Sequence, residues 1–206
     1  GLVLYDLLAG RQSIHRHRSW PAAAMLARAP LVPAGLRGGF SYWDAQVDDD
    51  RLVRTVVASA IREGATVREH TEVLSIRRDG ESWAVRTVSD ESSFAFVVNA
   101  AGPWMNQFLA KNSIRASYVL SLVRGSHIVL RRPISDLGLL LQSIGDQRVF
   151  FALPWKGGTL VGTTEILHRG PLDDVRPSDE EIDYLVGRYN RYFSSPIARA
   201  DVAESF

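Results

Sequence analysis

The sequence predicts a mixed α/β fold in which a half built of helices and strands precedes a mostly antiparallel half. Apolar residues at helical spacing over residues 50–63, and an apolar strand over 94–99 that runs into a helix, mark the first half. After about residue 109, short strands separated by Gly- or Pro-bearing turns favour antiparallel neighbours. A single helix near the end of the sequence is expected to cover that sheet.

The first helix is predicted over residues 50–63. Three aspartates, Asp48 to Asp50, stand at its start, and Gly64 follows its end, as helix boundaries usually require. Its apolar positions repeat every three or four residues, which predicts one amphipathic helix. These positions are Leu52, Val53, Val56, Val57, Ala60 and Ile61.

Three extended segments are expected next, paired in chain order as a meander. Residues 66–77 and 82–88 flank the turn-forming sequence Arg78-Asp79-Gly80-Glu81, which predicts a hairpin. The third segment is the continuous apolar run over 94–99.

The second half offers further strands and one helix. The strands are expected over residues 120–130, 137–142, 148–153 and 159–163. The helix begins with a capping box from Ser178 to Glu181. Its inward stripe is predicted to be Ile182, Leu185, Val186 and Tyr189.

Composition excludes several classes of function. With 46% hydrophobic and 23% charged residues, the chain has the balance of a globular protein and not of a disordered one. It has no cysteine, which excludes disulfides, thiolate catalysis and cysteine metal sites. No metal site is expected from its histidines either, because no pair of them has convincing ligand spacing. A net charge of +1 gives no reason to expect a nucleic-acid partner.

The chain shows no apolar run long enough to span a membrane and no signal peptide. It opens on Gly-Leu-Val-Leu-Tyr-Asp without an initiator Met, so we expect it to be a piece of a longer protein.

One segment is unusually basic, because no acidic residue lies between Asp6 and Asp44. Apolar residues are interleaved there with the basic ones, a pattern that suits an anionic membrane surface or an anionic ligand. A solvated face in an arginine-rich chain would look the same, and both interpretations stay open. The basic residues are Arg11, His15, Arg16, His17, Arg18, Arg28 and Arg37.

The run Phe96-Val-Val-Asn-Ala-Ala-Gly-Pro-Trp104 has the character of a nucleotide-binding junction. Gly102 has no side chain to block a close approach to the backbone. Pro103 at the first helical position leaves free N–H groups and a positive dipole end facing the gap. A plain strand-to-helix connection is the alternative.

His127 is the candidate catalytic base. Strand alternation puts Gly125, His127 and Val129 on one face, so the histidine lies among small or apolar groups. Its titration range near neutrality suits proton abstraction, although a hydrogen-bonded core histidine would fit the same pattern. The Gly162-Thr163-Thr164 strand end could line a cofactor pocket or form the edge of an ordinary hairpin.

Eight blocks spread over almost the whole chain resemble, in order, the FAD-dependent glycerol-3-phosphate dehydrogenases. The Gly-Ser-His-Ile-Val and Asp-Asp-Arg-Leu-Val blocks separate this family from the broader amino-acid-oxidase-like flavoproteins. The blocks are Gly1-Leu-Val-Leu-Tyr-Asp6, Gly39-Phe-Ser-Tyr-Trp-Asp44, Val47-Asp-Asp-Asp-Arg-Leu-Val53, Val98-Asn-Ala-Ala-Gly-Pro-Trp104, Val123-Arg-Gly-Ser-His-Ile-Val129, Phe151-Ala-Leu-Pro-Trp155, Gly162-Thr-Thr-Glu165 and Glu181-Ile-Asp-Tyr-Leu185.

The resemblance implies the central portion of an amino-acid-oxidase-like fold. Residues 1–45 would lead into the substrate domain, 46–109 would form part of the FAD-binding domain, and 110–206 would form an antiparallel substrate domain. The family's Gly-x-Gly-x-x-Gly turn is not in this sequence, so we expect the chain alone to bind FAD weakly or not at all. Arg124 stands where lysine is common, and Glu165 replaces the usual Asp, which leaves its role open.

The implied reaction oxidises glycerol 3-phosphate to dihydroxyacetone phosphate, with hydride transfer to FAD and onward electron transfer to quinone. The parent protein would be cytoplasmic and peripheral to the inner membrane. His127 matches the histidine that faces the substrate. The implied FAD contacts are Val73, Ala100, Ala101, Gly102, Trp104 and Thr163. Two rival functions are an FAD-dependent amine or amino-acid oxidase and a non-catalytic binding module.

Overall fold

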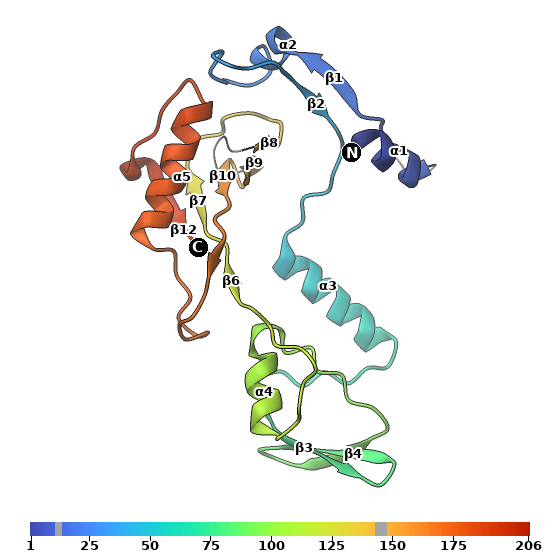
Figure 1. Ribbon diagram of the computed structural model, residues 1–206. Coiled ribbons are helices and arrows are strands. Elements are labelled where there is room, and N and C mark those ends of the chain that lie inside the picture. The colour runs from blue at the N-terminus through green and yellow to red at the C-terminus, as the bar shows by residue number, and fades with distance from the viewer. Residues whose placement is uncertain (11–13, 143–147) are drawn as a thin grey trace. The chain divides into compact units, whose positions relative to one another are not determined.

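The computed structural model describes residues 1–10, 14–142 and 148–206, so Arg11 of the basic segment lies outside the described residues. The chain divides into two compact units (Figure 1). The larger unit comprises Gly1–Asp44 and Leu122–Phe206, and the smaller unit comprises Ala45–Ser121. The sequence-based boundaries at 45/46 and 109/110 differ from these limits mainly in that residues 110–121 belong with the smaller unit.

A five-stranded antiparallel sheet forms the centre of the larger unit. Its spatial order is β12-β7-β10-β9-β8. The short pair β6 and β11 lies outside this sheet, and η3 spans Arg199–Asp201. The strands are β6 (Val123–Arg124), β7 (His127–Leu130), β8 (Leu139–Gln142), β9 (Val149–Trp155), β10 (Gly158–Gly162), β11 (Ile166–Leu167) and β12 (Val202–Ser205).

Helix α5 (Asp179–Tyr192) packs against β7 and β10 of this sheet (Figure 1). Its Leu185 and Tyr189 are fully buried, in one core cluster with Ile128 and Leu130 of β7, while Ile182 and Val186 pack on the edge of that cluster. The capping box is confirmed, because Ser178 Oγ accepts from the Glu181 N–H and the Glu181 carboxylate accepts from the Ser178 N–H.

The strand expected over residues 120–130 is interrupted, which corrects the sequence prediction. β6 ends at Arg124 and β7 begins at His127, and β6 pairs with β11 instead of continuing in the main sheet. The cause is Ser126, whose N–H donates to the Thr164 hydroxyl at 2.8 Å and whose carbonyl accepts from the Thr164 N–H.

The entry segment of the larger unit contains α1 (Leu2–Ala9), β1 (Arg18–Pro21), α2 (Ala22–Leu26) and β2 (Gly38–Ser41), with β1 and β2 antiparallel. The chain then meets the end of α5, where Leu31 is buried and forms an isolated bridge with Phe193. In the basic segment, His17 pairs with Asp6, and the Arg28 guanidinium stacks over Trp20. Among the described residues, no helix is both long and apolar enough to cross a membrane.

The smaller unit contains the predicted helix and a three-stranded meander, although the first strand begins at Val73 and not at residue 66, and the third spans Glu91–Phe94. Asp48 caps α3 (Asp49–Arg62) by accepting from the Arg51 N–H, and β3, β4 and β5 pair in chain order. The meander strands are β3 (Val73–Asp79), β4 (Ser82–Thr87) and β5 (Glu91–Phe94). η2 (Gly102–Trp104) and α4 (Met105–Lys111) follow.

The strand expected over residues 94–99 is wrong for this structure, because strand pairing ends at Phe94. Phe96 and Val98 are each 86% exposed. Their apolar pattern is typical of a buried strand, but a strand forms only where a neighbouring strand completes its hydrogen bonds, and the described residues supply none to this segment.

Candidate active site

His127 occupies the first position of β7, directly opposite Gly162, the last residue of β10. A side chain at Gly162 would place its Cβ only 2.2 Å from the His127 Cδ2 atom, so the imidazole ring occupies the space that glycine leaves free. The rings of Phe151 and Phe206 flank the imidazole, with centroids 5.5 and 5.4 Å from its own. The ring is therefore held in an apolar, aromatic environment.

Burial lowers the pKa of His127 below its ordinary value, and a hydrogen bond with the Gly125 backbone opposes that shift in part. At neutral pH the imidazole is consequently neutral and can accept a proton. The backbone of His127 exchanges two hydrogen bonds with Phe206, at 2.7 and 3.1 Å, which fixes the start of β7.

Thr163 lies beside His127, because it follows the glycine that pairs with the histidine. Its side chain is half-buried, and its hydroxyl donates to the Thr164 carbonyl at 3.0 Å. The Thr163 side chain lies close to the backbone of Gly125. Only glycine leaves this space free, since a Cβ at position 125 would lie 2.8 Å from the Thr163 hydroxyl oxygen. The structure thus brings two sequence-predicted residues together at adjoining strand ends.

A buried polar cluster adjoins these strand ends. The Glu181 carboxylate, on a residue only 1% exposed, accepts hydrogen bonds from the hydroxyls of Ser126 and Thr164 at 2.8 and 2.7 Å. Its second oxygen accepts from the Ser178 N–H at 2.9 Å and from the guanidinium of Arg124. Arg124, from β6, forms an ion pair with it.

The Glu181 carboxylate is ionised over the whole physiological range. Burial by itself raises the pKa of this group, but the hydrogen bonds from Ser178, Thr164, Ser126 and Arg124 stabilise the anion and lower its pKa to about 2. A buried charge is tolerable here because it is paired and fully hydrogen-bonded.

In the smaller unit, the predicted cofactor turn is exposed and built of small residues. Gly102 has φ +53°, and a Cβ built there would meet no neighbouring atom within 4 Å. The Ala101 N–H donates to the Asn99 side-chain oxygen, whereas the buried Asn99 Nδ2 has no partner among the described residues. An open turn beside an unsatisfied buried donor fits a polar group of a bound cofactor. Trp104, which closes η2, is 44% exposed.

Val73 is the remaining predicted FAD contact in the smaller unit. It begins β3 and pairs with Thr87. The preceding residue, Glu72, forms an ion pair with Lys111 at the C-terminal end of α4. The structure therefore places Val73 and the Ala100–Gly102 turn at opposite ends of α4. His127 and Thr163 belong to the larger unit, and the other predicted residues belong to the smaller one.

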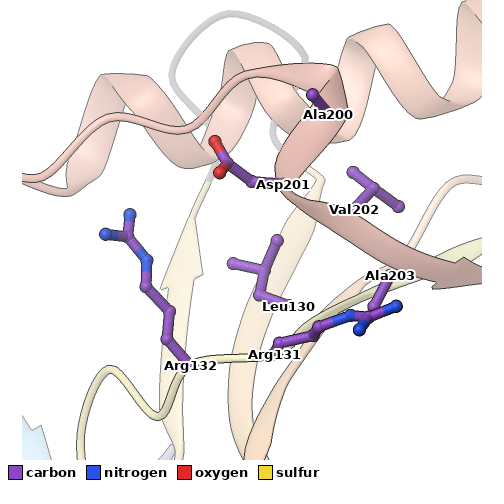
Figure 2. Close-up of a pocket in the computed structure, with 7 residues that line it drawn as sticks. All are labelled: Leu130, Arg131, Arg132, Ala200, Asp201, Val202 and Ala203. Carbon is purple, nitrogen blue, oxygen red and sulfur yellow. The ribbon is translucent and has the colours of Figure 1, made fainter.

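A separate hollow of about 340 Å³ lies at the far end of β7 from His127 (Figure 2). Figure 2 shows the Arg131 and Arg132 side chains diverging from the strand end. Arg132 donates to the carbonyls of Ser195 and Pro196. The hollow is lined by Leu130, Arg131, Arg132 and Ala200 to Ala203, none of which belongs to the predicted site. In the described part of the chain, no cluster of three His, Asp or Glu could hold a metal ion.

Sequence reasoning missed the partners of His127 and the second role of Glu181. The capping box identified Glu181 only as a helix cap, although its carboxylate also binds Ser126 and Thr164. A glycine followed by two threonines at a strand end was the available signal, because it leaves room for a ring and supplies two hydroxyls.

The sequence of the chain is similar to that of known proteins. Residues 3–206 match the family model described as FAD dependent oxidoreductase. The chain is 35% identical to D-erythritol 1-phosphate dehydrogenase of Brucella abortus over 100% of its length and 42% of that protein. It is 30% identical to aerobic glycerol-3-phosphate dehydrogenase of Escherichia coli, covering 42% of it, and 33% identical to glycerol-3-phosphate dehydrogenase of Pseudomonas aeruginosa, covering 41%.

Solved structures of similar fold are also known. The glycerol-3-phosphate dehydrogenase of Bacillus halodurans, complexed with FAD, superposes with a TM-score of 0.80 at 26% identity, over 91% of this chain and 40% of that one. Glycine oxidase of Geobacillus kaustophilus, at 22% identity and a TM-score of 0.70, shares the fold over 99% of this chain and 53% of its own. The chain spans about two fifths of the length of the curated relatives named above.

Proposed function

The chain belongs to the FAD dependent oxidoreductase family, and from this premise we propose that its parent protein oxidises the secondary hydroxyl of glycerol 3-phosphate to give dihydroxyacetone phosphate. The observation that carries the proposal is the half-buried, neutral imidazole of His127 at the strand end beside Gly162 and Thr163. Relatives named glycerol-3-phosphate dehydrogenase, at 30% and 33% identity over the whole chain, support the choice of substrate.

In this proposal His127 accepts the proton of the substrate hydroxyl as the carbon–oxygen bond becomes a carbonyl. Its lowered pKa keeps the ring in the proton-accepting form at neutral pH. The rings of Phe151 and Phe206 limit the access of water to the imidazole and fix its plane. Bound FAD supplies the acceptor for the hydride that leaves the carbinol carbon.

Each unit, taken by itself, contains residues that are candidates for contact with FAD. In the smaller unit, Ala100, Ala101 and Gly102 present an open turn beside the Asn99 amide nitrogen, which has no partner among the described residues, and Trp104 follows them. The resemblance adds the Val73 backbone toward the adenine end. From the larger unit, the Thr163 hydroxyl is the candidate contact. Since the chain spans about two fifths of its relatives, further FAD contacts are expected from the rest of the parent protein.

Quinone as the final electron acceptor and a position at the inner face of the membrane also belong to the proposal. Their support is the resemblance stated above and the similarity to a relative named aerobic glycerol-3-phosphate dehydrogenase. The basic segment is the candidate for contact with anionic lipid, through residues such as Arg16, Arg18 and Arg37. Pelleting of the parent protein with anionic but not with neutral vesicles would support this part.

D-erythritol 1-phosphate is the second candidate substrate, because a relative named for it is 35% identical to this chain. It presents the same chemistry, a hydroxyl to be oxidised on a phosphorylated polyol, with one more carbon in the chain.

Anaerobic mixing of the flavin-loaded parent protein with each candidate tests the proposal. Glycerol 3-phosphate is expected to bleach the visible flavin absorbance faster than D-erythritol 1-phosphate, and amino acids such as glycine are expected to leave it unchanged. Faster bleaching by the erythritol compound would transfer the proposal to that substrate. Bleaching by amino acids alone would favour an oxidase, and no bleaching by any of them would favour a non-catalytic module.

A further inference from the structure

The Glu181 carboxylate connects three separate segments of the larger unit. It belongs to the first turn of α5, it accepts from the Ser126 hydroxyl in the link between β6 and β7, and it accepts from the Thr164 hydroxyl just beyond β10. Each hydroxyl has a single proton to donate, and both protons go to the same carboxylate oxygen. The second oxygen takes the Ser178 N–H and the Arg124 guanidinium, so every contact with this carboxylate comes from a donor.

The two linked segments lie next to the reacting strand ends. Ser126 directly precedes His127, and Thr164 directly follows Thr163. The ladder between β7 and β10 ends at the His127–Gly162 pair, so regular sheet bonds do not continue beyond it. Past that point, Thr164 accepts from the Ser126 N–H and donates to Glu181. Where the sheet ends, hydrogen bonds to the Glu181 carboxylate therefore hold the Ser126 and Thr164 segments in place.

Resting on the proposed function, we propose that Glu181 is a positioning residue, whose buried carboxylate sets the placement of His127 and Thr163 by holding Ser126 and Thr164 together. A cap that served α5 alone would need only the Ser178 N–H. The further bonds to two hydroxyls and to Arg124 have no part in capping, and they converge on the site.

Glu181→Gln in the flavin-loaded parent protein is the direct test. The amide oxygen can still accept from both hydroxyls, but the amide NH₂ then faces the Ser178 N–H and Arg124, which are donors. Because small misplacements of catalytic groups are costly, we expect kcat per bound flavin to fall about tenfold or more, with flavin content unchanged. The matched control is Asp183→Asn, an exposed carboxylate of the same helix that also pairs with an arginine, Arg199. It should leave kcat unchanged.

Thr164 provides a second pair of variants that leaves the Glu181 side chain itself unchanged and removes only one of its hydrogen bonds. Thr164→Val removes the hydroxyl that joins Ser126 to Glu181, whereas Thr164→Ser restores it. We expect Thr164→Val to lower kcat and Thr164→Ser to recover most of it. If Glu181→Gln does not yield folded protein, this pair carries the test.

A readout without turnover separates the two proposals. In protein labelled with ¹³C-histidine, the His127 ring resonance, assigned with a His127→Asn variant, is expected to shift in Glu181→Gln and Thr164→Val but not in Asp183→Asn. Unchanged resonances together with unchanged kcat, even with lowered thermal stability, would overturn the positioning role. Shifted resonances in a protein that oxidises no polyol phosphate would uphold the positioning and overturn the proposed function.

Discussion

The two units of the chain differ in how much of their apolar surface they bury themselves. In the larger unit, α5 and the sheet enclose a core that includes Ile128, Leu130, Leu185 and Tyr189. In the smaller unit, α3 has no buried residue, although its sequence is strongly amphipathic. The difference teaches that an apolar stripe predicts that a face will be covered but not which surface covers it.

The same contrast separates the two parts of the candidate site. Around His127 every neighbour belongs to the larger unit, and a buried carboxylate fixes the adjoining chain. The Ala100–Gly102 turn, in contrast, is exposed and follows a segment whose Phe96 and Val98 are 86% exposed. The surroundings of His127 are therefore largely enclosed, whereas the Ala100–Gly102 turn is open.

The largest expected contrast is in stability, when one apolar side chain in each unit is replaced by alanine. Leu185→Ala removes a fully buried side chain and is expected to cost about 2–5 kcal/mol of unfolding free energy. Val98→Ala removes a side chain that is 86% exposed, and is expected to change the value by less than about 0.5 kcal/mol. Urea unfolding of both variants measures the contrast. Equal losses would show that the exposed segment is packed in solution.

Two glycines of the larger unit offer a sharper comparison. Gly162→Ala would push a methyl group into the His127 ring, so kcat is expected to fall about 100-fold. Gly187→Ala, within α5, meets no atom within 4 Å and should leave kcat unchanged while stabilising the helix by about 0.5–1 kcal/mol. Steady-state kinetics and thermal unfolding of both variants provide the check. A fully active Gly162→Ala protein would refute the close packing of ring and glycine.

The buried carboxylate predicts a smaller effect that depends on pH. The pKa of Glu181 is lowered from 4.5 to about 2 in the folded chain, so ionisation of this group stabilises the fold above pH 4.5. That contribution should be lost as the pH falls from 4.5 toward about 2. We expect the stability advantage of the wild type over Glu181→Gln to shrink in this window, as measured by urea unfolding. An advantage that does not change with pH would mean that the carboxylate is not ionised there.

Local signals in the sequence predicted most of the elements. The Asp48 cap, the hairpin turn at Gly80 and Glu81, and the capping box of α5 are confirmed, because each depends on residues within a few positions of one another. The inward stripe of α5 is confirmed for the same reason.

The failures have non-local causes. The break between β6 and β7 depends on Thr164, which lies 38 residues from Ser126 in the sequence. The run at Phe96 is unpaired because the described residues provide no neighbouring strand for it. The role of His127 stays a prediction, although its aromatic surroundings and lowered pKa are those of a residue that can act as a base.

His127→Ala in the flavin-loaded parent protein tests the central claim most directly, with His168→Ala as the control histidine of the same unit. We expect the rate of anaerobic flavin reduction by glycerol 3-phosphate to fall about 100-fold or more, with flavin content unchanged. The wild-type rate should decline on the acid side only below pH 6.5, since burial lowers the pKa of His127 from that value. An unchanged rate in His127→Ala, or a loss of rate that simply follows a loss of flavin, would contradict the assignment of His127 as the base.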